Sequence, residues 1–351
     1  MKLFSHFVGT NGVDILEEFS CGHVAHEEVE TFTRSGNTLR LGGDSRIYHA
    51  IRRNGVTTPP PPVVEIAFQS NTHNLWTMGT ALDRDWKLGM MPGTSPSIVA
   101  LIGGGFQVAF QANTGHLWTV GTAGNRDWGL GMKAGTSPAI AALWDGGFEV
   151  AFQANTGSLW TVGNAGNRDW ALGMRAGTSP AITGLWGGGF QVAFQANTGQ
   201  LWTVGNAGNR NWELGMKAST SPAIAGLWGG GFEVAFQANT GQLWTVGNAL
   251  ARNWELGMRA DTSPSIMALV GGGFQVAFQA NTGDLWTVGN AGNRHWDLGM
   301  KAGTSPHIAP LPGNRWQVVF QANTGSLWKA GDDGVGDLHL GLDGASSPSG
   351  T

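Results

Sequence analysis

A short Arg-x-Trp motif, present in six copies, offers the clearest chemistry in this chain. An indole ring gives an apolar face on which the C–H face of a pyranose stacks, and a guanidinium gives a fork of hydrogen-bond donors for its hydroxyls. An asparagine precedes the arginine in four copies and adds an amide. The candidate carbohydrate-binding residues are Arg84, Trp86, Asn125, Arg126, Trp128, Asn167, Arg168, Trp170, Asn209, Arg210, Trp212, Arg252, Trp254, Asn293, Arg294 and Trp296.

The residue between arginine and tryptophan changes from copy to copy. It is aspartate in the first three copies, then asparagine twice, as at Asn211, and finally His295. The arginine is therefore kept where the carboxylate is gone, and pairing with that neighbour is not its only use. Two interpretations stay open, a sugar site and a structural pair in which the guanidinium stacks on the indole.

The motif belongs to a long internal repeat. A second tryptophan, in a Leu-Trp pair, recurs every 42 residues without insertion or deletion, at Trp76, Trp118, Trp160, Trp202, Trp244, Trp286 and Trp328. A fixed period of this size indicates a repeat architecture. We interpret these seven tryptophans as packing between repeats.

Each repeat contains four short segments with strand character. In the second copy they are Phe106–Gln111, Leu117–Val120, Trp128–Met132 and Ser137–Leu143, with a tight Asn-Thr-Gly turn between the first two. Four strands in about 42 residues are typical of a propeller blade. We predict an all-β fold, a seven-bladed β-propeller over residues 63–351. The Arg-x-Trp motif then follows a loop between strands, where binding residues usually sit.

The first 62 residues differ in composition and end in a proline-rich linker, Pro59–Pro62. The Ser-Pro-x-Ile segment occurs six times, whereas the other strands occur seven times, so one blade lacks a strand. We expect Ile47–Ile51 in this N-terminal extension to donate the strand that closes the ring.

Composition narrows the function further. Only 13% of residues are charged and the net charge is −4, which disfavours nucleic acid as a partner. No apolar run is long enough to span a membrane. Cys21 is the only cysteine, and His23 and His26 do not complete a zinc spacing, so no metal or cofactor is expected. We expect a cytoplasmic protein or one released without a clear signal peptide.

A third set of tryptophans, Trp144, Trp186 and Trp228, follows the fourth segment of three copies. Ile102 and Val270 take the same position elsewhere, which favours apolar packing. A ligand groove is the alternative for this set.

The segment from Ser137 to Trp160 resembles the blade of bacterial seven-bladed propeller lectins of the fucose-binding kind, and it is similar to tectonin and tachylectin-type repeats. The shared features are the Pro-x-Ile strand, the Gly-rich turn, the Val-x-Phe strand and the Leu-Trp return. The resemblance covers about residues 63–346. It implies a ring-shaped lectin with several weak, equivalent sites for glycans, often between adjacent blades.

We therefore predict a multivalent lectin with up to six similar sites, because the seventh copy lacks the arginine and has Leu338 in place of the tryptophan. A protein-interaction platform of the WD type is the alternative, although Trp-Asp is not periodic here. A glycosidase is disfavoured, since near-identical blades offer no unique acid, base and nucleophile. The sequence leaves the sugar and the oligomeric state open.

Overall fold

The computed structural model describes residues 3–8, 14–19, 32–35, 38–41, 48–51, 65–70, 72–79, 82–311, 313–341 and 347. The chain divides into two compact units, Met1–Pro62 and Val63–Thr351. No helix in the described ranges is long and apolar enough to cross a bilayer.

The first unit contains one antiparallel sheet in the order β1-β2-β5-β4-β3. Its strands are β1 (Leu3–Val8), β2 (Asp14–Phe19), β3 (Phe32–Ser35), β4 (Thr38–Leu41) and β5 (Tyr48–Ile51). β5, the strand expected to close the ring, pairs with β2 on one side and β4 on the other. This arrangement does not use β5 in a blade, and closure by the N-terminal extension stays a prediction.

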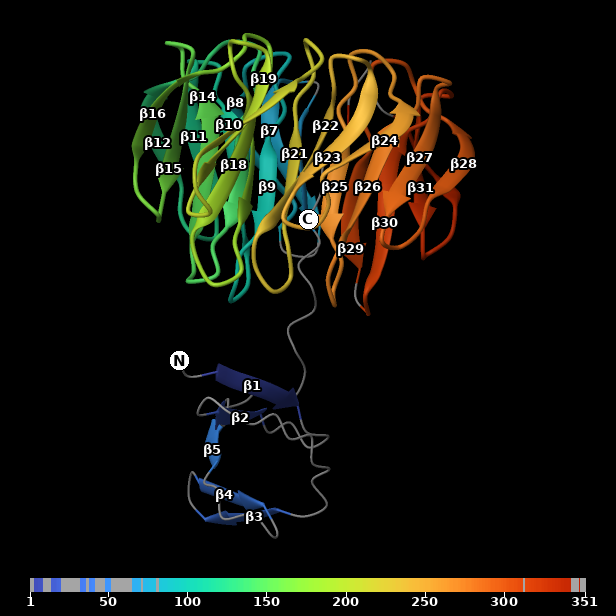
Figure 1. Ribbon diagram of the computed structural model, residues 1–351. Helices are drawn as coiled ribbons and strands as arrows, with labels where there is room; N and C mark the ends of the chain where they lie inside the picture. Colours follow the sequence, from blue (N-terminus) through green and yellow to red (C-terminus); the bar gives the residue numbers. More distant parts are fainter. Residues whose placement is uncertain are drawn as a thin grey trace. The chain divides into compact units, whose positions relative to one another are not determined.

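The second unit is a propeller of seven antiparallel blades, as predicted (Figure 1). The first blade has three strands in the structure, β6 (Glu65–Gln69), β7 (Asn74–Gly79) and β8 (Arg84–Gly89). The next three blades have four strands each: β9 (Ser97–Ala100), β10 (Phe106–Gln111), β11 (His116–Gly121), β12 (Arg126–Gly131); β13 (Ala139–Ala142), β14 (Phe148–Gln153), β15 (Ser158–Gly163), β16 (Arg168–Gly173); β17 (Ala181–Gly184), β18 (Phe190–Gln195), β19 (Gln200–Gly205), β20 (Arg210–Gly215).

The last three blades repeat this plan. Their strands are β21 (Ala223–Gly226), β22 (Phe232–Gln237), β23 (Gln242–Gly247), β24 (Arg252–Gly257); β25 (Ser265–Ala268), β26 (Phe274–Gln279), β27 (Asp284–Gly289), β28 (Arg294–Gly299); β29 (His307–Leu311), β30 (Arg315–Gln321), β31 (Ser326–Gly331) and β32 (Gly336–Gly341). The first strands of neighbouring four-stranded blades contact one another, so they form the inner wall of the ring.

The pairing register defines two ends of the ring. In the third blade Ala142 pairs with Phe148, Glu149 with Gly163, and Thr161 with Arg168, so the turns after the first and third strands lie at the same end. We call this the arginine end, because the last strand of each blade with the motif starts there with its arginine. The opposite, hairpin end carries the Asn-Thr-Gly turns and the crossovers between blades.

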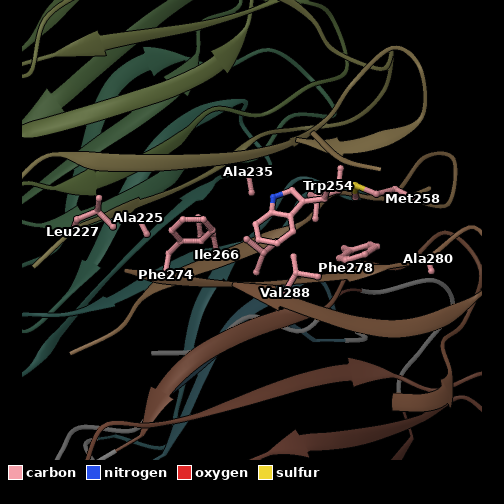
Figure 2. Close-up of a cluster of buried hydrophobic side chains, with 12 residues drawn as sticks. Ala225, Leu227, Ala235, Trp254, Met258, Ile266, Phe274, Phe278, Ala280 and Val288 are labelled. Carbon is pink, nitrogen blue, oxygen red and sulfur yellow. The ribbon is translucent and has the colours of Figure 1, made fainter. Parts of the chain in front are cut away.

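Hydrophobic core fills the spaces between neighbouring blades. Figure 2 shows one such cluster, in which Trp254 and Met258 of the fifth blade meet Ile266, Phe278 and Val288 of the sixth. The alternation of each strand sends one set of side chains to the preceding blade and the other set to the following blade. Both faces of the second strand are consequently buried, as in Phe106–Gln111.

Candidate functional site: the grooves between neighbouring blades

The six arginines of the motif are exposed at the start of the fourth strand, and each covers the indole ring two residues later. The guanidinium carbon lies 4.0 Å from the ring centroid in the Arg126–Trp128, Arg168–Trp170 and Arg210–Trp212 pairs. The Arg294–Trp296 distance is 3.9 Å. This geometry is that of a cation–π pair. One face of each indole is therefore taken by the arginine, while the guanidinium remains exposed with its N–H groups available.

The first and fifth copies depart from this geometry. The arginine lies 4.4 Å from the ring centroid for Arg84–Trp86 and 4.6 Å for Arg252–Trp254. In sequence these two copies carry Leu82-Asp83 and Leu250-Ala251 where the others have Gly-Asn. The altered loop thus coincides with a looser stack.

The indole ring of the motif is fixed by its nitrogen as well. Trp170 Nε1 donates to Thr161 Oγ1 at 3.1 Å, and the same bond recurs at 3.0 Å between Trp212 and Thr203. The threonine hydroxyl is buried inside the blade, so the tryptophan cannot turn without leaving a buried donor unpaired. The Arg–Trp pair is therefore a rigid part of the wall of the blade.

The asparagine of the motif braces its own loop. The Oδ1 atoms of Asn125, Asn209 and Asn293 accept hydrogen bonds from Gly121, Gly205 and Gly289 N, at 3.2–3.3 Å. Asp83 does the same for Gly79 N at 2.9 Å. This side chain therefore holds the loop in place, a role that the sequence interpretation did not assign to it.

The other tryptophan set lies across the gap from these pairs. Trp170 and Leu172 of the third blade, and Trp202 of the fourth, are partly buried and pack on the same inter-blade cluster. A groove of about 200 Å³ lies there, lined by Leu172, Gly173 and, from the fourth blade, Thr198, Gln200, Trp202 and Asn211. The sequence interpretation of Trp202 as packing is thus incomplete, because its half-buried ring also lines the groove.

The same pairing of walls recurs around the ring. Each of six inter-blade clusters combines the motif tryptophan of one blade with the hairpin tryptophan of the next. The six pairs are Trp86 with Trp118, Trp128 with Trp160, Trp170 with Trp202, Trp212 with Trp244, Trp254 with Trp286, and Trp296 with Trp328. The predicted motif tryptophans therefore lie at six equivalent seams between blades; at the seam between the third and fourth blades the groove is lined by residues other than Arg168 and Trp170.

A polar pair beside each hairpin tryptophan varies between blades. Beside Trp202, Asn211 Nδ2 donates to Gln200 Oε1 at 3.1 Å. Beside Trp118 the pair is His116 with Asp127, at 3.4 Å. Asp127 and Asn211 are the Cα partners of the two tryptophans and so lie on the same face of the sheet. These positions were not predicted as site residues; their variation between otherwise near-identical copies is the signal that marks them.

The sixth blade changes this arrangement. His295 stacks on Trp286 with ring centroids 4.9 Å apart and an interplanar angle of 18°, and its Nε2 lies 3.2 Å from Asp284 Oδ2. The imidazole therefore covers one face of the Trp286 indole. Within the described residues no group of three or more metal-ligating side chains forms a metal site.

Comparisons with known proteins support the fold. No protein-family profile matches the chain, and no curated protein matches it in sequence. The solved structures similar in fold include a mutant of Aleuria aurantia lectin in complex with Fucalpha1-6GlcNAc, and the fucose-specific lectin from Aleuria aurantia in a mercury-derivative form. The first is 12% identical with a TM-score of 0.51, over 73% of this chain and 96% of that one.

The second is 10% identical with a TM-score of 0.51, over 72% of this chain and 96% of that one. At this identity the likeness concerns the propeller fold.

Proposed function

We propose that this protein is a multivalent lectin whose sugar sites are the grooves between neighbouring blades. The observation that carries the proposal is the recurrence, at six seams between blades, of an arginine-capped tryptophan from one blade and a partly buried tryptophan from the next. A pyranose offers a C–H face for an indole and hydroxyls for amide and guanidinium groups. Trp202, Gln200 and Asn211 line one groove, and Arg168 stacks on Trp170 of the same seam between blades.

Groove size agrees with a small ligand. About 200 Å³ for the groove between the third and fourth blades is below the range of about 300–1,000 Å³ found for drug-sized ligands, so this groove suits a single sugar ring. A shallow site of this kind binds weakly, and useful affinity comes from several grooves engaging one glycosylated surface, a gain of roughly 10²–10⁴. The fucose-binding neighbours make fucosylated glycans the first ligands to test.

The first test replaces the motif arginine at four of the seams between blades. We expect replacement of Arg126, Arg168, Arg210 and Arg294 by alanine to lower binding to a densely fucosylated surface on the order of 10²-fold, because most of the avidity is lost. Arg168→Ala alone changes such binding little, since five motif arginines remain.

A matched control removes four cations outside the ring. Arg34, Arg40, Arg52 and Arg53 belong to the first unit, Met1–Pro62. Their replacement by alanine changes the net charge equally and should leave glycan binding unchanged. Equal losses in the two variants would mean that charge, and not the groove, drives binding.

A second variant addresses the other wall of the same four grooves, with leucine at the tryptophans that face those arginines: Trp160, Trp202, Trp244 and Trp328. If the sugar sits between the walls, the four-arginine variant and the four-tryptophan variant should both lose the fucose-inhibited binding that the parent shows. Retained, fucose-inhibited agglutination in both would exclude the grooves. Partner binding insensitive to any free sugar would favour the protein-interaction platform.

A further inference from the structure

The arginine end of the ring carries a compact cluster of exposed aromatic side chains at its axis. Trp144, Trp186 and Trp228 stand at the tips of the turns that follow the first strands of three consecutive blades. Their ring centroids are 4.3 Å apart for Trp144–Trp186, 4.9 Å for Trp186–Trp228 and 6.2 Å for Trp144–Trp228. Each tryptophan is nevertheless 43% exposed. The sequence interpretation of simple packing therefore does not account for this cluster.

The inner strands bring the three tips together. A Cβ atom on Gly184 would collide with Ala142 O, and one on Gly226 would collide with Gly184 O. Gly226 N also donates to Thr183 Oγ1 at 2.9 Å across the blades. These glycines, each two residues before a tryptophan, allow the inner strands to approach closely. The cluster is thus held in place before any ligand binds.

Exposed apolar side chains are unevenly distributed between the two ends of the ring. Among the described residues, eight large hydrophobic side chains are exposed in turns of the arginine end: Leu82, Ile102, Trp144, Trp186, Trp228, Leu250, Val270 and Val335. The described turns of the hairpin end expose none of this size. Exposed apolar patches mark sites of contact with a protein, a membrane or a ligand.

Charges of both signs surround this apolar centre. The six motif arginines lie exposed further from the axis, and six aspartates are exposed at the same end: Asp83, Asp127, Asp145, Asp169, Asp332 and Asp333. The contact therefore depends on the apolar centre. Exposed tryptophans at the end of the ring match the acyl–headgroup boundary of a bilayer, where tryptophan is enriched.

A second copy of the chain fits this patch less well. A tryptophan offers about 150–250 Å², so three at 43% exposure present on the order of 200–300 Å². A stable protein interface needs about 800 Å² on each partner, whereas a bilayer sets no such minimum.

We propose that the arginine end of the ring docks on a lipid bilayer, with Trp144, Trp186 and Trp228 entering the interfacial region. The ligand is the bilayer itself, and the apolar side chains make the contact. This activity is separate from sugar binding.

The experiment uses the full chain and vesicles that contain no glycan. Flotation with phosphatidylcholine vesicles, and with vesicles containing about one third phosphatidylglycerol, measures the partition coefficient. We expect the parent to float with both kinds of vesicle, because the apolar cluster makes the contact. Serine at Trp144, Trp186 and Trp228 together should lower the partition coefficient at least tenfold. Brominated lipids should quench the parent's fluorescence and not that of the triple variant.

A natural replacement supplies the matched control. Replacing the same three tryptophans by isoleucine copies Ile102, the residue of another blade at this position. This variant tests whether the fold tolerates the change, and it should retain part of the vesicle binding. Binding to a fucosylated resin without lipid reports separately on the grooves, so failure of the lectin proposal leaves the vesicle result interpretable. Equal flotation of parent and serine variant overturns the proposal, as does no flotation of the parent. A dimer that the serine variant abolishes, without vesicle binding, would assign the cluster to a second copy.

Discussion

Two buried glutamates should make the stability of the ring depend on pH. Glu149 and Glu233 occupy a fully buried position in the second strand, where four other blades have glutamine. Burial raises the pKa of each carboxyl from its ordinary value of 4.5 to about 7, although hydrogen bonds from Ala165 N and Ala249 N act in the opposite direction.

Glutamine shows what this position requires. Gln107 Oε1 accepts from Ala123 N at 3.1 Å, and its Nε2 donates to Gly124 O at 2.7 Å. Glu149 Oε2 accepts from Ala165 N at 2.9 Å, while Oε1 is buried and has no hydrogen-bond partner among the described residues. An ionised carboxylate cannot donate as the glutamine amide does. A protonated carboxyl can, and we infer that Glu149 is stabilised as the acid.

The sign of the effect follows from proton binding. Between pH 4.5 and about 7 the folded state holds the proton that the unfolded state has lost, so the free energy of unfolding falls as pH rises through this window and is level above it. At about 1.4 kcal/mol per pKa unit the ceiling is about 3 kcal/mol for each group. Because relaxation and water reduce such penalties, we expect about 1–3 kcal/mol.

Glutamine at both positions should remove this penalty. The Glu149→Gln, Glu233→Gln variant should match the parent near pH 4.5 and exceed it by about 2–6 kcal/mol at pH 8, in chemical denaturation followed by tryptophan fluorescence. All 17 tryptophans lie in the ring, so the signal reports this unit. The reverse change, Gln191→Glu, should introduce the same dependence. Parallel curves for parent and double variant from pH 4.5 to 8 would refute the reasoning.

Three further predictions concern the scaffold and the sites. Thr203→Val leaves the N–H of Trp212 unpaired and should cost about 1–3 kcal/mol in unfolding free energy, measured against Thr198→Val in an exposed turn. Deleting residues 1–55 should lower the Tm, since Ile66 is 41% exposed where its equivalent Val108 is fully buried; an unchanged Tm would make the segment an appendage. Calorimetry with free fucose should give four to six sites per chain, and one site would contradict the recurring grooves.

The sequence was sufficient to predict the ring because its signals are local and repeated. The 42-residue step fixes the blade, and Gly115 in its turn adopts a φ of 85°, as the Asn-Thr-Gly turn requires. Seven blades follow from seven copies. The sequence did not show where a fourth strand for the first blade comes from, since that depends on contacts between the ends of the chain.

Much of the candidate site depends on contacts between repeats, which a pattern within one repeat does not contain. Trp128 and Trp118 belong to one blade but lie on opposite faces of it, and each meets a tryptophan from a different neighbour. The sequence predicted the six arginines as a set, and the structure places them on equivalent walls. The sequence did not predict the wall that faces the arginines, because a tryptophan such as Trp118 has the same strand pattern whether it packs in the core or lines a groove.

Differences between the copies of the repeat affect both walls of one groove, the groove between the fifth and sixth blades. There Arg252 lies 4.6 Å from the ring centroid of Trp254, the longest of the six such distances. On the facing wall His295 stacks on Trp286 and takes the indole face that a sugar would use. Both walls therefore depart from the common plan in the same groove. Under the lectin proposal this groove is the weakest of the six, although the sequence difference on each wall is only one or two residues.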